Sequence, residues 1–274
     1  MKMIAVGDNV TDCYLDQKIF YPGGNAVNVA VGCRRDGFDE VAYIGVFGDD
    51  INAQHIKWAL DQEKVTYDRS RTLHAISGRP GVNINEEGDR IFVGGPKHTA
   101  QRLVRLQLLD DDLEYIKGFD VCHTSCYSSI EPELPKLAGS CVVSFDFSDR
   151  RDPEYLKVVC PWVRFAFFSG SDLSEEEICA LADRCHELGT EVVGVTRGSK
   201  GALFSWKGQR YTQGIKPVEV VDTMGAGDSF IAGFLTHFTR TGDMAASLDY
   251  AAGVSAVTCT CHGGFGYPHP FVEE

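Results

Sequence analysis

Short apolar runs alternate along most of the chain with stretches whose apolar residues recur every three to four positions. The short runs are typical of strands and the periodic stretches of amphipathic helices. This alternation predicts an α/β fold, in which a mostly parallel sheet is covered by helices on both faces. The predicted strands are 3–7, 41–46, 119–123, 141–147, 164–168 and 191–196. The predicted helices are 25–35, 52–62, 131–138, 152–159 and 174–188, and Ser174 with Glu177 forms a capping box at the start of the last.

Two regions break the alternation. Residues 75–93 are predicted to form a β-hairpin, with strands 81–85 and 90–93 on either side of the turn-like residues 86–89. We expect this hairpin to be part of a small antiparallel lid. A second hairpin is predicted at 201–206 and 209–212, and two helices follow at 226–239 and 244–258.

Composition and charge narrow the class of protein. A length of 274 residues predicts one or two domains, at about 150 residues per domain. The net charge of −13 argues against a nucleic-acid or anionic-membrane binder, which would show a basic patch. No apolar run is long enough for a transmembrane helix, and the N-terminus lacks a signal-peptide pattern. We therefore expect a soluble, cytoplasmic protein.

Ten cysteines are a high count for such a chain. None of their spacings matches the paired C-x2-C pattern of a structural zinc site. In an intracellular protein of this length, reduced thiols are the expected state.

Residues 222–228, Asp-Thr-Met-Gly-Ala-Gly-Asp, precede a stripe of apolar residues that predicts a buried amphipathic helix. Glycines at a helix start leave backbone N–H groups unobstructed, and the helix dipole adds positive potential, so an anion can bind there. Asp228, in the first turn, is placed to accept a proton from an attacking hydroxyl. A capped helix with no chemistry is the simpler interpretation of this motif taken alone.

Three motifs in register resemble the PfkB, or ribokinase-like, carbohydrate kinase family. Residues 222–228 match its D-T-x-G-A-G-D signature, residues 23–30 match G-G-x-x-x-N-x-A, and residues 196–201 match T-x-G-x-x-G. The resemblance covers essentially the whole chain. It implies a ribokinase-like three-layer sandwich with a mostly parallel central sheet, formed by residues 1–274 as one domain. Segments near 9–22 and 75–97 would form a small β lid.

The resemblance also implies roles for individual residues. Asp228 would be the catalytic base, and Gly225, Ala226 and Gly227 would supply the anion hole. The sugar side would be formed by Asp8, Asp12, Gly24, Asn25, Asn28 and Asp228, with Asp8 a candidate partner for a cationic amine. The nucleotide side would be formed by Thr196, Gly198, Gly201, Gly227 and Gly263.

The implied cofactors are ATP and Mg²⁺. Where the family often has N-x-x-E, this chain has Ser-Gly-Ser-Asp at 169–172, so Asp172 is the candidate metal residue. A monovalent cation such as K⁺ is implied near Asp222, Cys259 and Gly263. Relatives often form homodimers through the lid, which makes the same arrangement an expectation here.

Within the family, the features shared with one branch imply phosphorylation of the 6-hydroxyl of a fructosamine such as fructoselysine, a glycated amino acid. These features include residues 146–149, Asp-Phe-Ser-Asp, and 262–263, His-Gly. The alternatives are a ribokinase, fructokinase or nucleoside kinase activity, or a non-catalytic sugar sensor. Asp228 and its glycines are intact, and a sensor would not need them.

Overall fold

The computed structural model describes the backbone of residues 1–84 and 90–271. Two sheets form within these residues. The larger has nine strands in the order β13-β12-β11-β10-β9-β8-β1-β4-β5. All its neighbours pair in parallel except the β11–β12 and β12–β13 pairs, so the predicted second hairpin is confirmed as its edge. Its strands are β1 (Lys2–Gly7), β4 (Glu40–Phe47), β5 (Arg71–Thr72), β8 (Val121–Ser125), β9 (Val142–Asp146), β10 (Phe165–Ser169), β11 (Val192–Thr196), β12 (Ala202–Trp206) and β13 (Gln209–Gln213).

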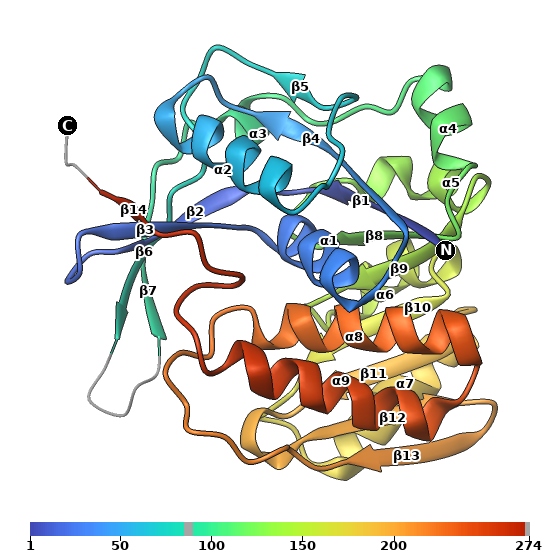
Figure 1. Ribbon diagram of the computed structural model, residues 1–274. Helices are drawn as coiled ribbons and strands as arrows, with labels where there is room; N and C mark the ends of the chain where they lie inside the picture. Colours follow the sequence, from blue (N-terminus) through green and yellow to red (C-terminus); the bar gives the residue numbers. More distant parts are fainter. Residues whose placement is uncertain (85–89, 272–274) are drawn as a thin grey trace.

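Helices cover both faces of this sheet, which gives the predicted three layers (Figure 1). Side chains alternate across each strand, so Met3 and Ala5 of β1 join one core while Ile4 and Val6 join the other. The first core includes residues of α1 (Asn25–Asp36), α2 (Ile51–Gln62), α8 (Ala226–Thr241) and α9 (Met244–Thr258). The second includes residues of α3 (Ala100–Leu103), α4 (Asp110–Ile116), α5 (Leu134–Ala138), α6 (Pro153–Val159) and α7 (Glu175–Glu187). Short 3₁₀ helices lie at η1 (Glu131–Glu133), η2 (Cys160–Trp162) and η3 (Gly198–Lys200).

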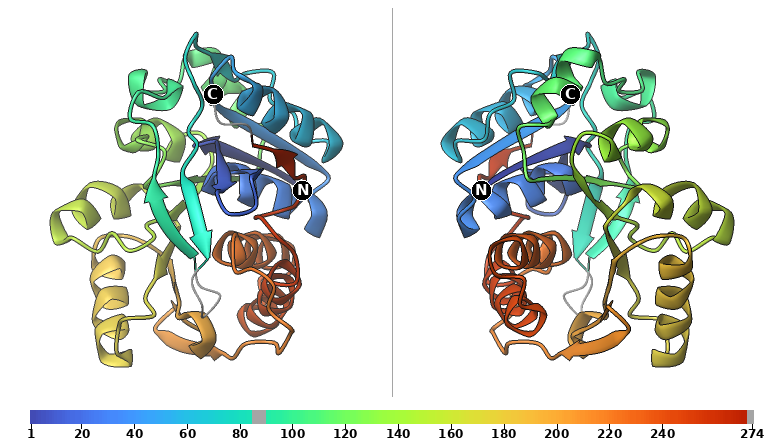
Figure 2. Two further views of the ribbon diagram at one scale, coloured as in Figure 1. Left: turned by 90° about the vertical axis from the view of Figure 1, so that its left-hand side faces the viewer. Right: turned by 90° about the vertical axis from the view of Figure 1, so that its right-hand side faces the viewer.

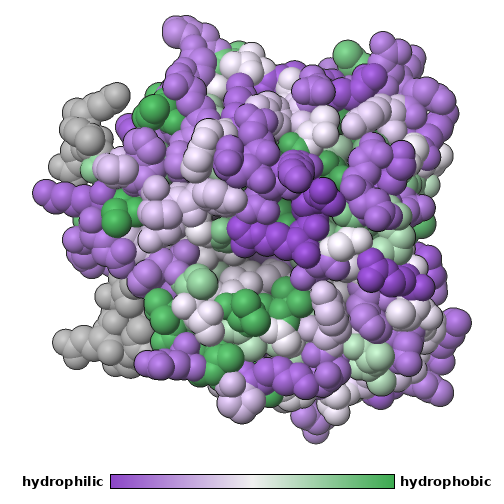
Figure 3. All heavy atoms as spheres, viewed as in Figure 1, coloured by the Kyte–Doolittle hydropathy of each residue, from purple (hydrophilic) through white to green (hydrophobic). Residues whose placement is uncertain are grey.

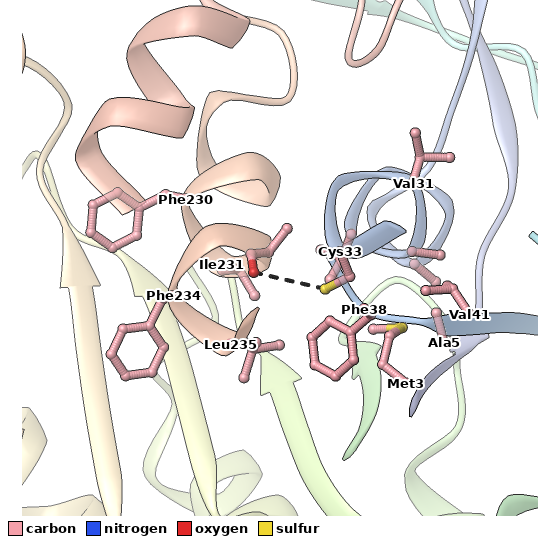
Figure 4. Packing of buried hydrophobic residues seen from close by; sticks show 14 of the residues in the cluster. Met3, Ala5, Val31, Cys33, Phe38, Val41, Phe230, Ile231, Phe234 and Leu235 are labelled. Carbon is pink, nitrogen blue, oxygen red and sulfur yellow. Dashed lines mark hydrogen bonds between the residues drawn. The ribbon is translucent and has the colours of Figure 1, made fainter. Parts of the chain in front are cut away.

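The helix predicted after residue 226 packs its apolar stripe into the first core, as expected. Figure 4 shows side chains of α8, among them Ile231 and Leu235, near Cys33 of α1 and Phe38. The Cys33 thiol donates to the carbonyl of Ala232 at 3.8 Å. A Cβ on Gly32 would lie 2.6 Å from that of Ala232, so glycine allows α1 to approach α8 this closely. The packing brings the two helix N-termini together.

The smaller sheet has five strands in the order β14-β3-β2-β6-β7. It is mostly antiparallel, with one parallel pair between β2 and β6. It lies on the left of Figure 1, beyond the carboxyl end of β1, and faces the viewer in the left view of Figure 2. Its strands are β2 (Val10–Tyr14), β3 (Ile19–Gly23), β6 (Gly81–Ile84), β7 (Arg90–Gly94) and β14 (His269–Pro270).

Most predicted elements are confirmed, with boundaries shifted by one or two residues. The hairpin of β6 and β7 is present, and its predicted turn at 86–89 lies outside the described residues. The capping box of Ser174 and Glu177 is present at the start of α7. The sequence did not predict β5, β14, α3 or α4, which are short. All ten cysteines are free thiols. Among the described residues, no helix has the length and apolar character needed to cross a membrane.

Candidate active site

The turn before α8 has a geometry that requires glycine. Gly225 is the N-cap residue of α8 in the left-handed region, at φ 72°. A Cβ there would also lie 2.7 Å from the Cα of Gly264, so no larger residue fits without movement. The carbonyl of Ala226 accepts from Ser255 Oγ at 2.8 Å, which ties the turn to α9. Gly227 is exposed and has open space where a Cβ would stand, so the backbone of the first helical turn is accessible to an anion.

Two amides from α1 hold the carboxylate of Asp228. Asn25 Nδ2 donates to Asp228 Oδ1 at 2.7 Å, and Asn28 Nδ2 donates to Oδ2 at 2.7 Å. The carboxylate is partly exposed. The two amides hold both oxygens in fixed directions, which suits a base that accepts a proton from a substrate hydroxyl. The predicted base and two of the predicted sugar-side residues meet in space, although about 200 residues separate them in the sequence.

Asn25 also contacts a second carboxylate and a buried imidazole, which the sequence did not assign to the site. Its Nδ2 donates to Asp146 Oδ2 at 2.8 Å, and its Oδ1 lies 3.0 Å from His123 Nε2. Burial lowers the pKa of His123 to about 3, so the imidazole is neutral. Since Asn25 Oδ1 is an acceptor, Nε2 carries the proton and Nδ1 accepts from the Ser144 hydroxyl at 2.9 Å. This chain of hydrogen bonds fixes the orientation of the Asn25 amide.

Asp146 is the most perturbed carboxyl group of the site. Burial, and then the charge of Asp228, raise its pKa from 3.8 to about 7. Asp146 ends β9 and His123 lies in β8, the neighbouring parallel strand. Parallel strands place their carboxyl ends at one edge of the sheet, where ligands bind in open α/β folds. The position of Asp146 at the end of its strand was the available signal for including it, whereas His123 lies in the middle of β8.

Asp8 is placed as a cap of α1. Its carboxylate accepts from the backbone N–H of Asn25 at 2.7 Å and of Ala26 at 3.3 Å. It also accepts from the hydroxyls of Ser125 at 3.1 Å and Ser128 at 3.0 Å. With four donors and an exposed fraction of 4%, Asp8 stabilises the N-terminus of α1 and so positions Asn25. Contact between Asp8 and a substrate amine stays a prediction.

Asp12 and Gly24 lie where the smaller sheet meets α1. Asp12 is on β2, and a Cβ on Gly23 of β3 would lie 2.3 Å from its Oδ2. Gly24 has a φ of 101° and lies against the backbone of Asn9. Glycines at both positions therefore leave room for the Asp12 carboxylate and for the sharp entry into α1.

The predicted nucleotide loop follows β11. Thr196 ends the strand, and its hydroxyl donates to the carbonyl of Phe168 at 3.3 Å. Gly198 and Gly201 have φ values of 58° and 81°. A Cβ on Gly201 would lie 2.0 Å from the carbonyl oxygen of Gln213, whereas Gly198 has open space. The loop is an accessible backbone turn at the carboxyl edge of the sheet.

Asp172 lies apart from this network, on the surface beyond β10. Both of its oxygens accept from the guanidinium of Arg151, at 3.2 and 3.0 Å, and its side chain is 63% exposed. The Arg151 hydrogen bond lowers its pKa. Within the described part of the chain, no group of three or more His, Cys, Asp or Glu side chains is arranged to hold a metal ion.

Asp222, Cys259 and Gly263 are brought together beside the turn. The backbone N–H of Asp222 donates to the carbonyl of Cys259 at 3.2 Å. The buried Asp222 carboxylate accepts from Gly263 N at 3.0 Å and from Met224 N at 2.9 Å. The segment after α9 is thereby fixed against the turn that begins α8.

A groove of about 590 Å³ opens on the helical face, where apolar side chains gather over α8 and α9 (Figure 3). It touches the turn at Gly225 and Ser229, but Asp228 does not line it. The groove therefore lies beside the Asp228 carboxylate and does not contain it. Its lining comes from Asn28, Gly32, Arg35, Asp36, Lys216, Gly225, Ser229, Asp249, Tyr250, Gly253, Val254, Val257, Thr258, Gly264 and Phe265.

Comparison with known proteins shows which families of proteins and folds this chain is similar to. The chain is 49% identical over 274 residues to fructosamine kinase FrlD of Bacillus subtilis (strain 168), covering 100% of this chain and 96% of the relative. It is 32% identical over 269 residues to fructoselysine 6-kinase of Escherichia coli (strain K12), covering 97% and 100%. Arabidopsis thaliana ribokinase complexed with ribose and ATP superposes with a TM-score of 0.82 at 21% identity, covering 96% and 93%. A putative ribokinase II of E. coli, in complex with ATP and Mg²⁺, gives a TM-score of 0.79 at 21% identity, covering 96% and 94%. Residues 3–268 match the sequence pattern of the pfkB family carbohydrate kinases, and the chain belongs to this family.

Proposed function

We propose that the protein is an ATP-dependent kinase that phosphorylates the 6-hydroxyl of a fructosamine such as fructoselysine. The observation that carries the proposal is the Asp228 carboxylate, held by Asn25 and Asn28 at 2.7 Å each beside a glycine turn that leaves backbone N–H groups accessible. The names of the relatives at 49% and 32% identity support the substrate class.

In this proposal Asp228 accepts the proton of the sugar hydroxyl as that oxygen attacks the γ-phosphorus. The backbone N–H groups of Gly225, Ala226 and Gly227, together with the helix dipole, stabilise the negative charge on the transferring phosphoryl group. The left-handed turn at Gly225, with φ 72°, is already set in the folded chain, and the Ala226 N–H, which donates to the Thr223 carbonyl at 3.2 Å, would turn toward the phosphate. A net charge of −13 is no obstacle, since backbone groups rather than cationic side chains hold the phosphate.

The sugar would bind between the smaller sheet and the N-terminus of α1. Asp12 and the Gly24 turn would receive sugar hydroxyls, while Asn25 and Asn28 orient the base. Asp8 is proposed to act by holding α1 in place. The smaller sheet would act as a lid on a single kinase domain and exclude water from the phosphoryl group.

The nucleotide would lie along Thr196, Gly198, Gly201, Gly227 and Gly263. Open space at Gly198 and Gly227 is compatible with phosphates approaching the backbone. Mg²⁺ would be held mainly by those phosphates and by water, as this ion usually is, and would neutralise charge on the phosphates. Asp172 would have to give up Arg151 to join it, so we leave it outside the proposed metal shell.

A monovalent cation such as K⁺ is proposed beside Asp222, Cys259 and Gly263, whose contacts place the carbonyl of Cys259 and a buried carboxylate next to the anion hole. A homodimer through the smaller sheet is also proposed, because β7 is an edge strand with backbone groups left to pair. A cytoplasmic location is proposed from the use of ATP and from the ten free thiols.

The test is an ADP-release assay with fructoselysine, fructose, ribose and a nucleoside as separate acceptors. We expect kcat/KM to be highest for fructoselysine, with phosphate on its 6-oxygen by NMR. Turnover with a plain sugar and none with fructoselysine would favour the ribokinase, fructokinase or nucleoside kinase alternative. Sugar binding without any turnover would favour a sensor.

A further inference from the structure

The turn that supplies the anion hole is tied to the smaller sheet. The phenol of Tyr14, on β2, donates a hydrogen bond to Asp222 Oδ2. Met224, two residues further along the turn, packs with Tyr14, Tyr21 and Val82 in a small apolar cluster separate from the two main cores. Residues of the smaller sheet therefore contact the turn through both a polar and an apolar group.

The segment after α9 takes part in the same contact. Gly263 N donates to Asp222 Oδ2 at 3.0 Å, and a Cβ on Gly263 would lie 2.6 Å from the ring of Tyr21. From there the chain runs to the smaller sheet, where β14 pairs with β3 (Figure 1). Tyr14 and Tyr21 pack edge to face, with ring centroids 5.2 Å apart. The two tyrosines thus lie against both segments that border the anion hole.

The Asp222 carboxylate, which accepts from Tyr14, also accepts from the backbone of the turn. Its carboxylate is 1% exposed, and its Oδ1 accepts from Met224 N at 2.9 Å, one residue before Gly225. A hydrogen bond to a charged acceptor is strong and directional, so the position of the phenol influences where the carboxylate lies. The carboxylate in turn fixes the peptide that leads into the left-handed Gly225.

We propose that Tyr14 is a positioning residue, which couples the seating of the smaller sheet to the shape of the anion hole through its hydrogen bond with Asp222. The proposal rests on the sugar kinase function above. When the smaller sheet is seated over the sugar, the phenol holds Asp222 and the turn in the arrangement that receives the phosphoryl group. Without the sheet in place, the turn loses one of its fixed points, and ATP is protected from hydrolysis by water.

The test is Tyr14→Phe, which keeps the ring in its cluster and removes only the hydroxyl. We expect kcat to fall by about 10–100-fold, the loss of one hydrogen bond to a charged group, with the KM for sugar changed less than about threefold. The ratio of ADP released to sugar phosphate formed should not rise above that of the wild-type protein, because hydrolysis and transfer to sugar both need the ordered turn. Tyr21→Phe is the matched control, because it removes a phenol from the same cluster and should leave kcat near the wild-type value.

A kinetic cycle with Asp222→Asn separates positioning from general stability. Because Tyr14 acts through Asp222, Tyr14→Phe should slow an Asp222→Asn protein no further. An unchanged kcat for Tyr14→Phe, an equal loss for Tyr21→Phe, or additive losses in the cycle would each overturn the proposal. Melting temperatures of the variants show whether a loss follows unfolding, which would also contradict it. The wild-type assay decides the substrate independently, and the ratio of variant to wild type is measured with whichever sugar is turned over.

Discussion

Asp146→Asn is expected to change the way in which stability depends on pH. Asp146 is 9% exposed, and burial followed by the charge of Asp228 raises its pKa from 3.8 to about 7. At about 1.4 kcal/mol per unit, this shift of roughly three units means that the ionised carboxylate costs the folded state about 4 kcal/mol above neutral pH. Asn25, which donates to both carboxylates, offsets part of their repulsion.

The direction in which stability changes with pH follows from where the folded and the unfolded chain bind the Asp146 proton. The folded protein keeps the Asp146 proton up to about pH 7, whereas the unfolded chain releases it near its ordinary pKa of 3.8. The favourable contribution of the protonated group is therefore present at low pH and is lost as pH rises through this window. Between about pH 5 and about pH 7 the window spans about two units, so the free energy of unfolding should fall by about 3 kcal/mol from this group.

In Asp146→Asn this fall is absent. The variant also loses one acceptor, because Asp146 accepts from Ser148 N and from Asn25 Nδ2 at 2.8 Å each and an amide has one oxygen. That loss, about 1 kcal/mol, is the same at every pH. The variant should therefore gain about 3 kcal/mol relative to wild type between about pH 5 and about pH 8.

Urea unfolding of both proteins at the two pH values measures this difference. Asp172→Asn is the control: the pKa of Asp172 is lowered, so its titration lies below this range and its effect should be the same at both pH values. If Asp146→Asn also changed stability equally at both, Asp146 would not be a strained carboxylate, and our account of the paired acids would be wrong.

Three further substitutions test separate parts of the structure. Gly225→Ala should lower kcat at least about 100-fold and the free energy of unfolding by about 1–3 kcal/mol, because alanine is strained at this positive φ and its Cβ would clash with Gly264. Wild-type kinetics in this variant would contradict the requirement for glycine in the turn. Ser174→Ala should cost about 1 kcal/mol in urea unfolding and leave kcat unchanged, since it removes only the cap of α7. Asp172→Ala should leave the Mg²⁺ concentration for half-maximal rate unchanged, because Asp172 is paired with Arg151; a tenfold rise would place it at the metal.

The large sheet could be predicted because its strands are buried on both faces. Such strands appear as short apolar runs between turns, and the helices between them carry an apolar stripe. Short elements give no such period. The two residues of β14, His269 and Pro270, become a strand only by pairing with β3, some 250 residues away in the chain, and no local pattern records that contact.

The site residues likewise divide into those that a local sequence pattern predicts and those that depend on contacts between distant segments. Asp228, Asn25 and Asn28 could be found because each lies in a motif with glycines at fixed spacing. His123 and Asp146 lie in buried strands that also carry Thr124, Ser125 and Ser144, and buried polar residues of this kind more often serve a core hydrogen bond than a site. Their importance comes from the neighbouring positions of β8 and β9, which bring both side chains to Asn25. Asp8 is predicted on the sugar side, whereas its contact with the N-terminus of α1 depends on a turn geometry that sequence spacing does not reveal.

The role of Asp228 as the base is tested by the turnover of Asp228→Asn with fructoselysine and ATP, measured beside the wild-type protein. The side chain keeps its size, so the fold and sugar binding should persist, while the group that accepts the hydroxyl proton is lost. We expect kcat to fall by about 10²–10⁴-fold with sugar affinity retained. A variant that phosphorylates fructoselysine at nearly the wild-type rate would contradict the assignment of Asp228 as the base.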